Sequence, residues 1–478
     1  MTLPPLLQRS SQADLQFHQH DRQTIQRAVR VWGAGKPKSN SRDEREELLR
    51  KAFQDPEAAA RVVTRLEESE RQMLSIFELY GPAVSGGLLR AELVSRAINT
   101  SRKKKSTDND AGPLEDVAAQ LREKMVLFLG DGYLHDAYFN RYQFNFRMLP
   151  IAERNYPEMV LHPALVGRVS AAEPLGWTPT NILDQPVKSV ARRTSAEVAL
   201  DLQTVCGALR QMSNWSICRG EVMAKPQRAR LAKLAGLASS GTDPFQPPDV
   251  AGLYFELLKR MRCVDVHNHA LLETELGMQT QCLAAVQAQN WVRAWIVSPM
   301  WQDGLGVVAE RTGEYHYDQL GSQSIRHLRE LLAWALCRVA HSPDQWLDLL
   351  TFLRDFHDRG LVHKFYCCRG QFHWTPPFVA PVDKAGSAPH PESTWFNWLR
   401  LGGTWAANAL MVTLVTLGLV ERGMTPESKP RHCFRLTPLG RAVFGAPDVE
   451  LSELHADHRF LTVQPNHEIQ VYLEEADA

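Results

Sequence analysis

The spacing of hydrophobic residues predicts helices over most of the chain, separated by short stretches in which apolar and polar residues alternate. From Pro56 onward, apolar residues recur every three or four positions until a Gly-Pro pair at 81–82 ends the pattern. Shorter helical patterns follow at 86–98 and 115–132, and alternation at 133–149 predicts a hairpin. Three helices followed by a hairpin is the element order of a winged helix.

The same order returns twice further along the chain. The second copy is expected to contain helices at 195–212, 224–236 and 249–262 and a wing hairpin at 263–276. The third copy is expected to contain helices at 394–403 and 404–423, then a wing strand running into a short helix at 429–445. Thr437 and Pro438 are suited to cap and begin that last helix.

The fold class predicted from this pattern is mainly α with small β-hairpins, arranged as tandem winged-helix domains joined by helical segments and linkers. A chain of 478 residues is long enough for several such domains. The predicted segments are a charged helical segment at 1–56, a first winged helix at 57–168, a linker at 169–194, a second winged helix at 195–300, a helical connector at 301–375, a Pro-rich linker at 376–393, and a third winged helix with a C-terminal β segment at 394–478.

Composition sets limits on location and partners. Lys plus Arg equals 54 and Asp plus Glu equals 54, so a nucleic-acid surface must be a local patch. No stretch approaches ~20 consecutive apolar residues, and the N-terminus lacks a secretory signal. We therefore expect a cytoplasmic protein without membrane contact, and association with the nucleoid is compatible with this location. The eight cysteines form no Cys-x-x-Cys pair and are expected to be reduced thiols.

Several short motifs near the C-terminus suggest a family. The chain reads LTPLGR at 436–441 and FLTVQPNHEIQVYL at 460–473, and RGEVMAKPQRARLAKLAG occupies 219–236. These segments resemble the helicase-associated winged-helix module related to the N-terminal region of XPB-type helicases. The resemblance covers residues 195–478 and implies a helicase or nuclease partner, because such modules usually accompany a helicase motor and no motor is present here.

Basic residues are the candidate DNA contacts, since winged helices neutralise phosphates through their wings and helices. They fall in a polar loop, on the second helix of the second copy and on the third wing. The candidates are Arg102, Lys103, Lys104, Lys105, Lys225, Arg228, Arg230, Lys233, Lys429, Arg431, His432 and Arg435. The third copy's own recognition helix, 404–423, offers few side chains that could read bases.

Two groups of residues have metal-ligand character. Asp265, His267 and His269 form an Asp-x-His-x-His array that resembles the first metal motif of amidohydrolases. The helices that follow do not alternate with strands as a barrel requires, so a wing is favoured over a metal-dependent hydrolase. The second group consists of His363, Cys367, Cys368 and His373. Its two cysteines are adjacent, and adjacent cysteines are poor chelators of one ion, so a zinc site is disfavoured here.

No other enzymatic motif set is complete. The segment GAGKPKS at 33–39 has Arg30 where a phosphate loop requires glycine, and Pro37 after the lysine. We therefore expect no cofactor and no small-molecule substrate. The function expected is a non-enzymatic DNA-binding adaptor that places a helicase or nuclease on DNA, in a phage-defence or repair complex. A purely protein-docking scaffold and a metal-dependent hydrolase are the alternatives.

Overall fold

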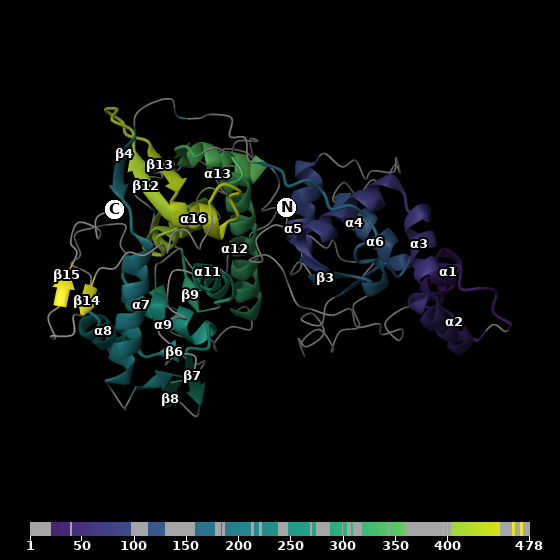
Figure 1. Ribbon diagram of the computed structural model, residues 1–478, viewed down its shortest axis with the longest axis horizontal. Helices are drawn as coiled ribbons and strands as arrows, with labels where there is room; N and C mark the ends of the chain where they lie inside the picture. The colour runs from purple at the N-terminus through teal and green to yellow at the C-terminus, as the bar shows by residue number, and fades with distance from the viewer. Residues whose placement is uncertain are drawn as a thin grey trace, which may run out of the picture. The chain divides into compact units, whose positions relative to one another are not determined.

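The computed structural model describes the chain in segments (Figure 1). The described residues are 21–38, 41–96, 113–129, 158–176, 187–211, 215–218, 222–237, 247–267, 270–273, 287–298, 300–303, 307–308, 318–342, 344–358, 403–449, 461–463 and 469–471, with isolated positions 183, 395 and 399. The chain divides into two compact units. The first comprises Met1–Ile182, Thr312–Val339 and Asp348–Ala407, and the second Leu183–Arg311, Ala340–Leu347 and Asn408–Ala478. The described chain is mainly helical, with small antiparallel sheets, as predicted.

The first unit begins with three helices that pack on one another. They are α1 (Arg22–Trp32), α2 (Arg42–Gln54) and α3 (Pro56–Arg65). Asp21 caps α1 by accepting the Thr24 N–H at 2.7 Å, and Trp32 is fully buried where that helix ends. The sequence pattern separated 1–56 from the helix starting at Pro56, whereas these three helices form one bundle.

The next six elements of the first unit build a small sheet covered by helices. They are α4 (Glu68–Tyr80), β1 (Ala83–Ser85), α5 (Gly86–Ser95), α6 (Pro113–Glu123), β2 (Leu127–Leu129) and β3 (Glu158–Leu161), followed by a 3-10 turn, η6 (Pro163–Leu165). The strands are antiparallel in the order β1-β3-β2. The predicted hairpin at 133–149 lies outside the described residues, and the strands that pair flank it.

The single helix predicted from Pro56 to Gly81 is two helices in the structure. Leu66 leaves the helical conformation with ψ 143°, which ends α3. Glu67 and Glu70 then form a capping box that starts α4. The apolar spacing continues across this break, so periodicity alone could not reveal it. Two further helices belong mostly to the first unit, α12 (Asp318–Ala340) and α13 (Leu349–Asp358).

The second unit contains the elements predicted for the second copy. They are α7 (Ser195–Arg210), α8 (Lys225–Leu234), α9 (Val250–Arg260), and the hairpin of β7 (Val264–His267) and β8 (Ala270–Glu273). A short antiparallel pair that the sequence did not predict, β5 (Ile217–Cys218) and β6 (Val222–Met223), lies between α7 and α8. The predicted helices and hairpin are confirmed. The helices α7, α8 and α9 pack pairwise, and α11 (Ala288–Val297) and the hairpin of β9 (Trp301–Gln302) and β10 (Val307–Val308) add to α9.

A second, larger sheet has the strand order β11-β13-β12-β4. Its strands are β4 (Lys188–Ala191), β11 (Leu347–Asp348), β12 (Val420–Met424) and β13 (His432–Leu436). The predicted linker at 169–194 therefore contains a sheet strand. The helix predicted at 404–423 ends earlier, because the chain turns at Gly418 with φ +69° and continues as β12. That helix begins as α15 (Thr404–Asn408) and passes through a π-helical stretch, η10 (Ala409–Leu414).

The C-terminal elements follow the prediction. The helix α16 (Pro438–Val443) is capped by Thr437, whose Oγ1 accepts the Gly440 N–H at 2.9 Å. A short antiparallel hairpin of β14 (Leu461–Val463) and β15 (Ile469–Val471) accounts for the predicted C-terminal β segment. Among the described helices, none is both long enough and apolar enough to cross a membrane.

Within the described residues, one type of turn between a helix and the strand that follows it occurs three times. In each case a residue with positive φ ends the helix, and the N–H of the next residue donates a hydrogen bond of 2.9 Å to the carbonyl of a leucine five residues before it. The positive-φ residues are Met125, Arg262 and Gly418, and the accepting carbonyls belong to Leu121, Leu258 and Leu414. The strands β2, β7 and β12 begin two residues after these positions, so the three predicted copies share the local geometry of this turn.

Candidate nucleic-acid interface

Helix α8 presents a basic face to solvent. Lys225, Arg230 and Lys233 are exposed, while Arg228, Leu231 and Ala235 form its buried stripe at helical spacing. At 1.5 Å per residue the exposed cations extend over about 12 Å of helix. Within the described residues, none of these three cations has an acidic partner.

Arg228 has a different role from the phosphate contact predicted for it. Its side chain is 5% exposed, and its Nε donates to Asp249 Oδ2 at 2.6 Å. Its Nη1 donates to the Met223 carbonyl at 2.6 Å, so this arginine joins α8 to the start of α9 and to β6. Sequence spacing placed Arg228 beside Lys225 but could not tell the inward face from the outward one.

Helix α9, the third helix of the second copy, cannot enter a DNA groove in this structure. Every residue from Val250 to Lys259 is buried, because α7, α8 and α11 surround it. The described residues from Thr404 to Leu419 are buried as well. In this structure, neither of these two helices exposes side chains that could enter a major groove.

The end of α9 carries exposed guanidinium groups beside the β7–β8 hairpin. Arg260 and Arg262 are both exposed, and Arg262 adopts φ +61°, a conformation that non-glycine residues rarely adopt. Asp265 is also exposed, and its own Oδ1 accepts the Val266 N–H at 2.8 Å. His267 closes β7, whereas its side chain and all of His269 lie outside the described part of the chain.

The basic residues of the third copy divide into exposed and structural members. Lys429 and Arg431 are exposed between β12 and β13, with Arg431 3.6 Å from Glu427. Arg435 donates to Glu421 Oε2 at 2.9 Å, and its guanidinium lies 4.8 Å from the centre of the Trp346 ring, so this cation already has partners in and beside the sheet. His432 is half-buried. Burial lowers its pKa, and nearby Arg422 lowers it further.

The basic sets of the second and third copies do not form one patch. In Figure 1, α8 and the tip of the β12–β13 hairpin lie at opposite ends of the second unit. The remaining predicted residues lie outside the described part of the chain. These residues are Arg102, Lys103, Lys104, Lys105, His363, Cys367, Cys368 and His373. Among the described residues, no group of His, Cys, Asp and Glu is arranged to hold a metal ion.

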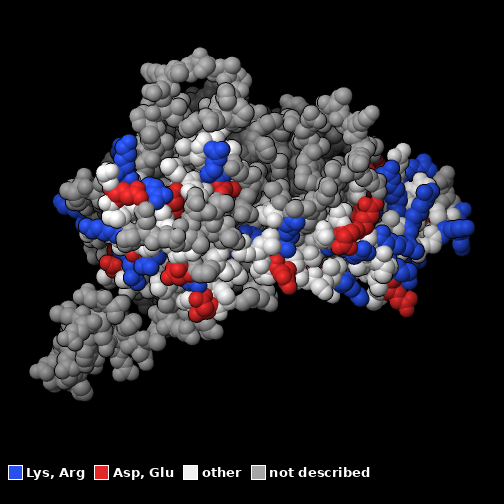
Figure 2. Space-filling model, turned by 90° about the horizontal axis from the view of Figure 1, so that it is seen from above, with Lys and Arg blue, Asp and Glu red and all other residues white. Residues whose placement is uncertain are grey.

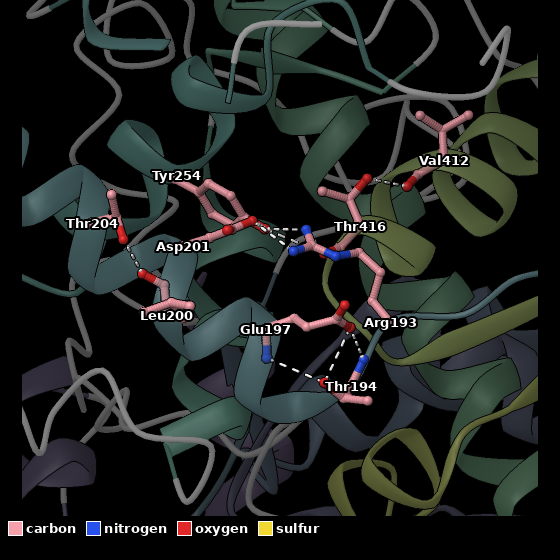
Figure 3. Close-up of polar contacts among 9 residues, drawn as sticks. All are labelled: Arg193, Thr194, Glu197, Leu200, Asp201, Thr204, Tyr254, Val412 and Thr416. Atoms are coloured by element: carbon pink, nitrogen blue, oxygen red, sulfur yellow. Dashed lines mark hydrogen bonds and ion pairs between the residues drawn. The ribbon is translucent and has the colours of Figure 1, made fainter. Parts of the chain in front are cut away.

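A polar network around Arg193 links α7 to α9 (Figure 3). Arg193 Nη2 donates to Asp201 Oδ2 at 2.7 Å, and Nη1 donates to the Tyr254 hydroxyl at 2.9 Å and to the Thr416 carbonyl at 3.3 Å. Thr194 and Glu197 close a capping box at the start of α7. Arg193 falls in the predicted linker, yet it joins β4 and α7 to α9 and to the helix that ends at Thr416.

Buried carboxylates elsewhere have structural partners. In the first unit, Glu92 accepts from Tyr80, Trp334, Arg96 and Arg338 while being fully buried. In the second unit, Asp303 Oδ1 accepts from the Trp295 indole at 2.8 Å, the Trp301 indole at 3.1 Å and the Thr413 hydroxyl at 2.9 Å.

Sequence reasoning missed both carboxylates. The signal for Glu92 was a single acid between apolar residues of a helix, and such an acid must find donors when buried.

His162 predicts a pH-dependent stability. It lies 2% exposed among Trp32, Phe53 and Phe128, with Nδ1 accepting the Ala164 N–H at 3.1 Å. Burial lowers the pKa of His162 to about 4, so the unfolded chain binds a proton more readily below pH 6.5. The contribution of neutral His162 to the free energy of unfolding is fully present above pH 6.5 and is lost as the pH falls toward 4. At pH 5 the loss is about 2 kcal/mol.

Urea unfolding at pH 8 and pH 5 measures this loss. The variant His162→Gln keeps an acceptor for Ala164 but does not titrate in this range, so its unfolding free energy should change about 2 kcal/mol less between the two pH values. An equal pH dependence in both proteins would contradict the assignment.

Comparisons with protein-family models, with curated proteins and with solved structures found no match to this chain.

Proposed function

We propose that this chain is a non-enzymatic adaptor that binds the DNA backbone and carries a helicase or nuclease partner. The observation that supports the proposal most directly is the outward face of α8, where Lys225, Arg230 and Lys233 are exposed without an acidic partner among the described residues. These three cations extend over about 12 Å of helix, a length over which one DNA strand presents three to four phosphates at ~3.4 Å of duplex axis per charge.

A tandem winged-helix architecture is part of this proposal. In the first unit, the elements follow in the order α4, β1, α5, α6, β2 and β3, and the strands form a sheet of order β1-β3-β2. Along the chain, α12, β11, α13, the helix beginning at Thr404, β12 and β13 repeat that succession, and three strands of the second sheet have the equivalent order β11-β13-β12. The repeated helix-to-strand junction supports the same interpretation for the α7–β8 segment. The similarity of the LTPLGR segment to helicase-associated modules is consistent with it.

The proposed binding mode uses phosphates and not base edges. Because α9 is buried, DNA is contacted by α8 and by the exposed arginines next to the β7–β8 hairpin. Backbone contacts of this type are sensitive to salt and largely indifferent to sequence. This chain also exposes apolar side chains to which a partner protein could bind: Leu200 of α7 is 62% exposed, and Leu234 of α8 is 42% exposed.

The test is DNA binding by the full chain over a range of salt concentrations. Changing Lys225, Arg230 and Lys233 together to glutamine should weaken binding to a duplex roughly tenfold and reduce the salt slope by about 2 to 3. The triple variant Lys225→Arg/Arg230→Lys/Lys233→Arg keeps the charge and should keep the slope. A wild-type chain that fails to bind duplex DNA at low salt, while still capturing a helicase or nuclease, would favour the protein-docking scaffold.

A second prediction concerns the backbone at Arg262. A non-glycine residue with φ near +60° costs about 1 kcal/mol relative to glycine, and the equivalent position at the third junction is Gly418. We expect Arg262→Gly to raise the unfolding free energy by about 0.5 to 1 kcal/mol and to weaken DNA binding several-fold. Calorimetry checks the expected rise in stability, and fluorescence anisotropy on the same samples checks the expected loss of DNA affinity.

The control for this prediction is Arg260→Gln, which removes a neighbouring exposed charge without altering backbone strain. It should weaken DNA binding and leave the unfolding temperature unchanged. If Arg262→Gly is more stable but binds DNA as wild type does, Arg262 makes no phosphate contact.

A further inference from the structure

The helices α1 to α3 carry a local excess of positive charge in a chain that is neutral overall. Between Arg22 and Arg65 there are eleven Lys and Arg residues and six Asp and Glu residues, out of 54 of each in the whole sequence. The rest of the chain therefore has 43 basic and 48 acidic residues, so its balance is the reverse. We call the segment Arg22–Arg65 the basic bundle.

The excess charge of the basic bundle lies at its surface. Nine of its basic side chains are exposed, against three of its acidic ones, Asp43, Glu47 and Glu57. Figure 2 shows a concentration of blue side chains over α1 to α3. A surface with this imbalance generates a positive potential that attracts polyanions.

Several of these cations have contacts within the bundle or the first unit. Arg65 Nη1 donates to the carbonyls of Arg30 and Val31 at 3.0 and 2.9 Å, which satisfies the end of α1. Arg61 pairs with Asp55 at 3.1 Å, and Arg27 pairs with Glu123. Exposed pairs of this kind contribute little to stability. Their role is local, and they do not explain the whole excess.

Three exposed cations have no such contact within the described residues. The side chains of Arg30, Lys36 and Lys38 have neither an acidic partner nor a hydrogen bond there. All three belong to the end of α1 and the turn after it, where the Gly33 backbone approaches two more guanidinium groups. A Cβ at that position would lie 3.6 Å from Arg61 Nε and 3.9 Å from Arg65 Nη1. Five cations therefore surround one turn.

The turn is held on a rigid support. Trp32, fully buried at the end of α1, donates its indole N–H to the Lys124 carbonyl at 2.9 Å. At the other side of the turn, the Lys38 N–H donates to Glu44 Oε1 at 2.6 Å, which fixes the chain to α2. Because the backbone that carries these cations is fixed, it loses less freedom on binding than the backbone of a mobile loop does.

The composition of this surface favours nucleic acid over a protein or a lipid membrane. Large hydrophobic side chains that are exposed occur at six described positions in the chain, and none lies between residues 22 and 65. Protein and membrane partners usually bury such anchors. Eight of the eleven basic residues are arginine, which binds phosphate through two parallel hydrogen bonds.

We propose that the basic bundle is a second DNA-binding surface, in which Arg30, Lys36 and Lys38 contact backbone phosphates. The inference rests on the proposed function for the identity of the polyanion, and it assigns contacts to a unit that carries none of the α8 cations. Binding at two sites on one chain also raises the effective concentration of DNA at each of them.

The experiment measures anisotropy of a labelled random-sequence duplex of about 30 base pairs, long enough at ~3.4 Å per pair to extend beyond a single site. The full chain is compared with Arg30→Gln/Lys36→Gln/Lys38→Gln and with the charge-retaining variant Arg30→Lys/Lys36→Arg/Lys38→Arg. We expect roughly tenfold weaker binding and a salt slope lower by about 2 to 3 for the first variant, and no change for the second. Circular dichroism and the unfolding temperature confirm that both variants are folded.

The outcomes separate this inference from the proposed function. An unchanged affinity and slope for the glutamine variant overturn the basic bundle as a DNA surface, whatever the α8 variant does. A reduced slope in the bundle variant together with an unchanged slope in the α8 variant supports the bundle and contradicts the α8 interface. Absence of duplex binding at low salt, with binding to phosphatidylserine vesicles that the bundle variant loses, overturns the inference in favour of a lipid surface.

Discussion

Replacing Glu92 by glutamine is expected to destabilise the first unit by about 3 to 5 kcal/mol, because it leaves a buried guanidinium without its counter-charge. Glu92 is 0% exposed and Arg338 is 3% exposed, and the two form a direct ion pair. Arg96 Nε and the Trp334 indole also donate to this carboxylate, at 2.8 and 2.9 Å. Burial raises the pKa of Glu92, but the charges of Arg338 and Arg96 and the hydrogen bonds from Tyr80 and Trp334 together lower it more, so the pKa lies below its usual value and the carboxyl stays ionised.

The measurement is urea unfolding of the full chain, with hydrogen exchange of peptides from α5 and α12 to locate the change in the first unit. Removing both charges in Glu92→Gln/Arg338→Gln should recover part of the loss, because no unpaired charge then remains. The matched control is Glu68→Gln, whose side chain is 69% exposed and pairs with Arg71, and a change below about 0.5 kcal/mol is expected. Equal effects of Glu68→Gln and Glu92→Gln would refute the structural role of the buried pair.

A single methyl group at Gly440 is expected to destabilise the second unit by about 3 kcal/mol. A Cβ at this position would lie 1.9 Å from the carbonyl oxygen of Leu419 and 2.9 Å from its carbonyl carbon. The same carbonyl accepts the Thr437 N–H at 3.1 Å, so it cannot move away without loss of that bond. We expect Gly440→Ala to lower the unfolding midpoint of the second unit and the yield of folded protein.

The opposite sign is expected from the same substitution at Gly207. This glycine lies within α7, and apart from its two neighbours and the backbone of that helix, no described atom comes within 4 Å of the position that a Cβ would occupy. Alanine in a helix is about 0.5 to 1 kcal/mol more favourable than glycine, so Gly207→Ala should stabilise. Stabilisation by both substitutions would show that α16 is not packed against Leu419 as described.

Local sequence patterns predicted many elements of this fold. The helices α7, α8 and α9 and the β7–β8 hairpin fall where apolar spacing placed them, because each is defined by its own periodicity and caps. Thr437 and Pro438 began α16 as expected, since cap chemistry is local as well. The errors at Leu66 and Gly418 concern helix ends, where one residue changes conformation while the apolar pattern continues.

The candidate site was predicted less well, because it depends on which side of a helix faces the interior. Lys225 and Arg228 are three residues apart, yet one is exposed and the other is buried against Asp249. Likewise, the buried position of α9 follows from α11, which the second-copy pattern did not include. The basic bundle was missed for another reason: its charges are spread over forty-four positions, and few are adjacent in the sequence.

The pairing of β4 with β12 has a consequence for synthesis on the ribosome. Arg422 is opposite Ala191 and Met424 is opposite Lys188, so the partners are at least 231 positions apart. At roughly 5 to 20 residues per second, β4 waits roughly 12 to 46 s for its neighbour to be translated. During that time, a nascent chain presents an unpaired strand edge, which is a template for misassembly. The sheet that includes β4 is thus completed only when β12 and β13 have been translated. A chain truncated before Val420 lacks both strands and cannot complete this sheet.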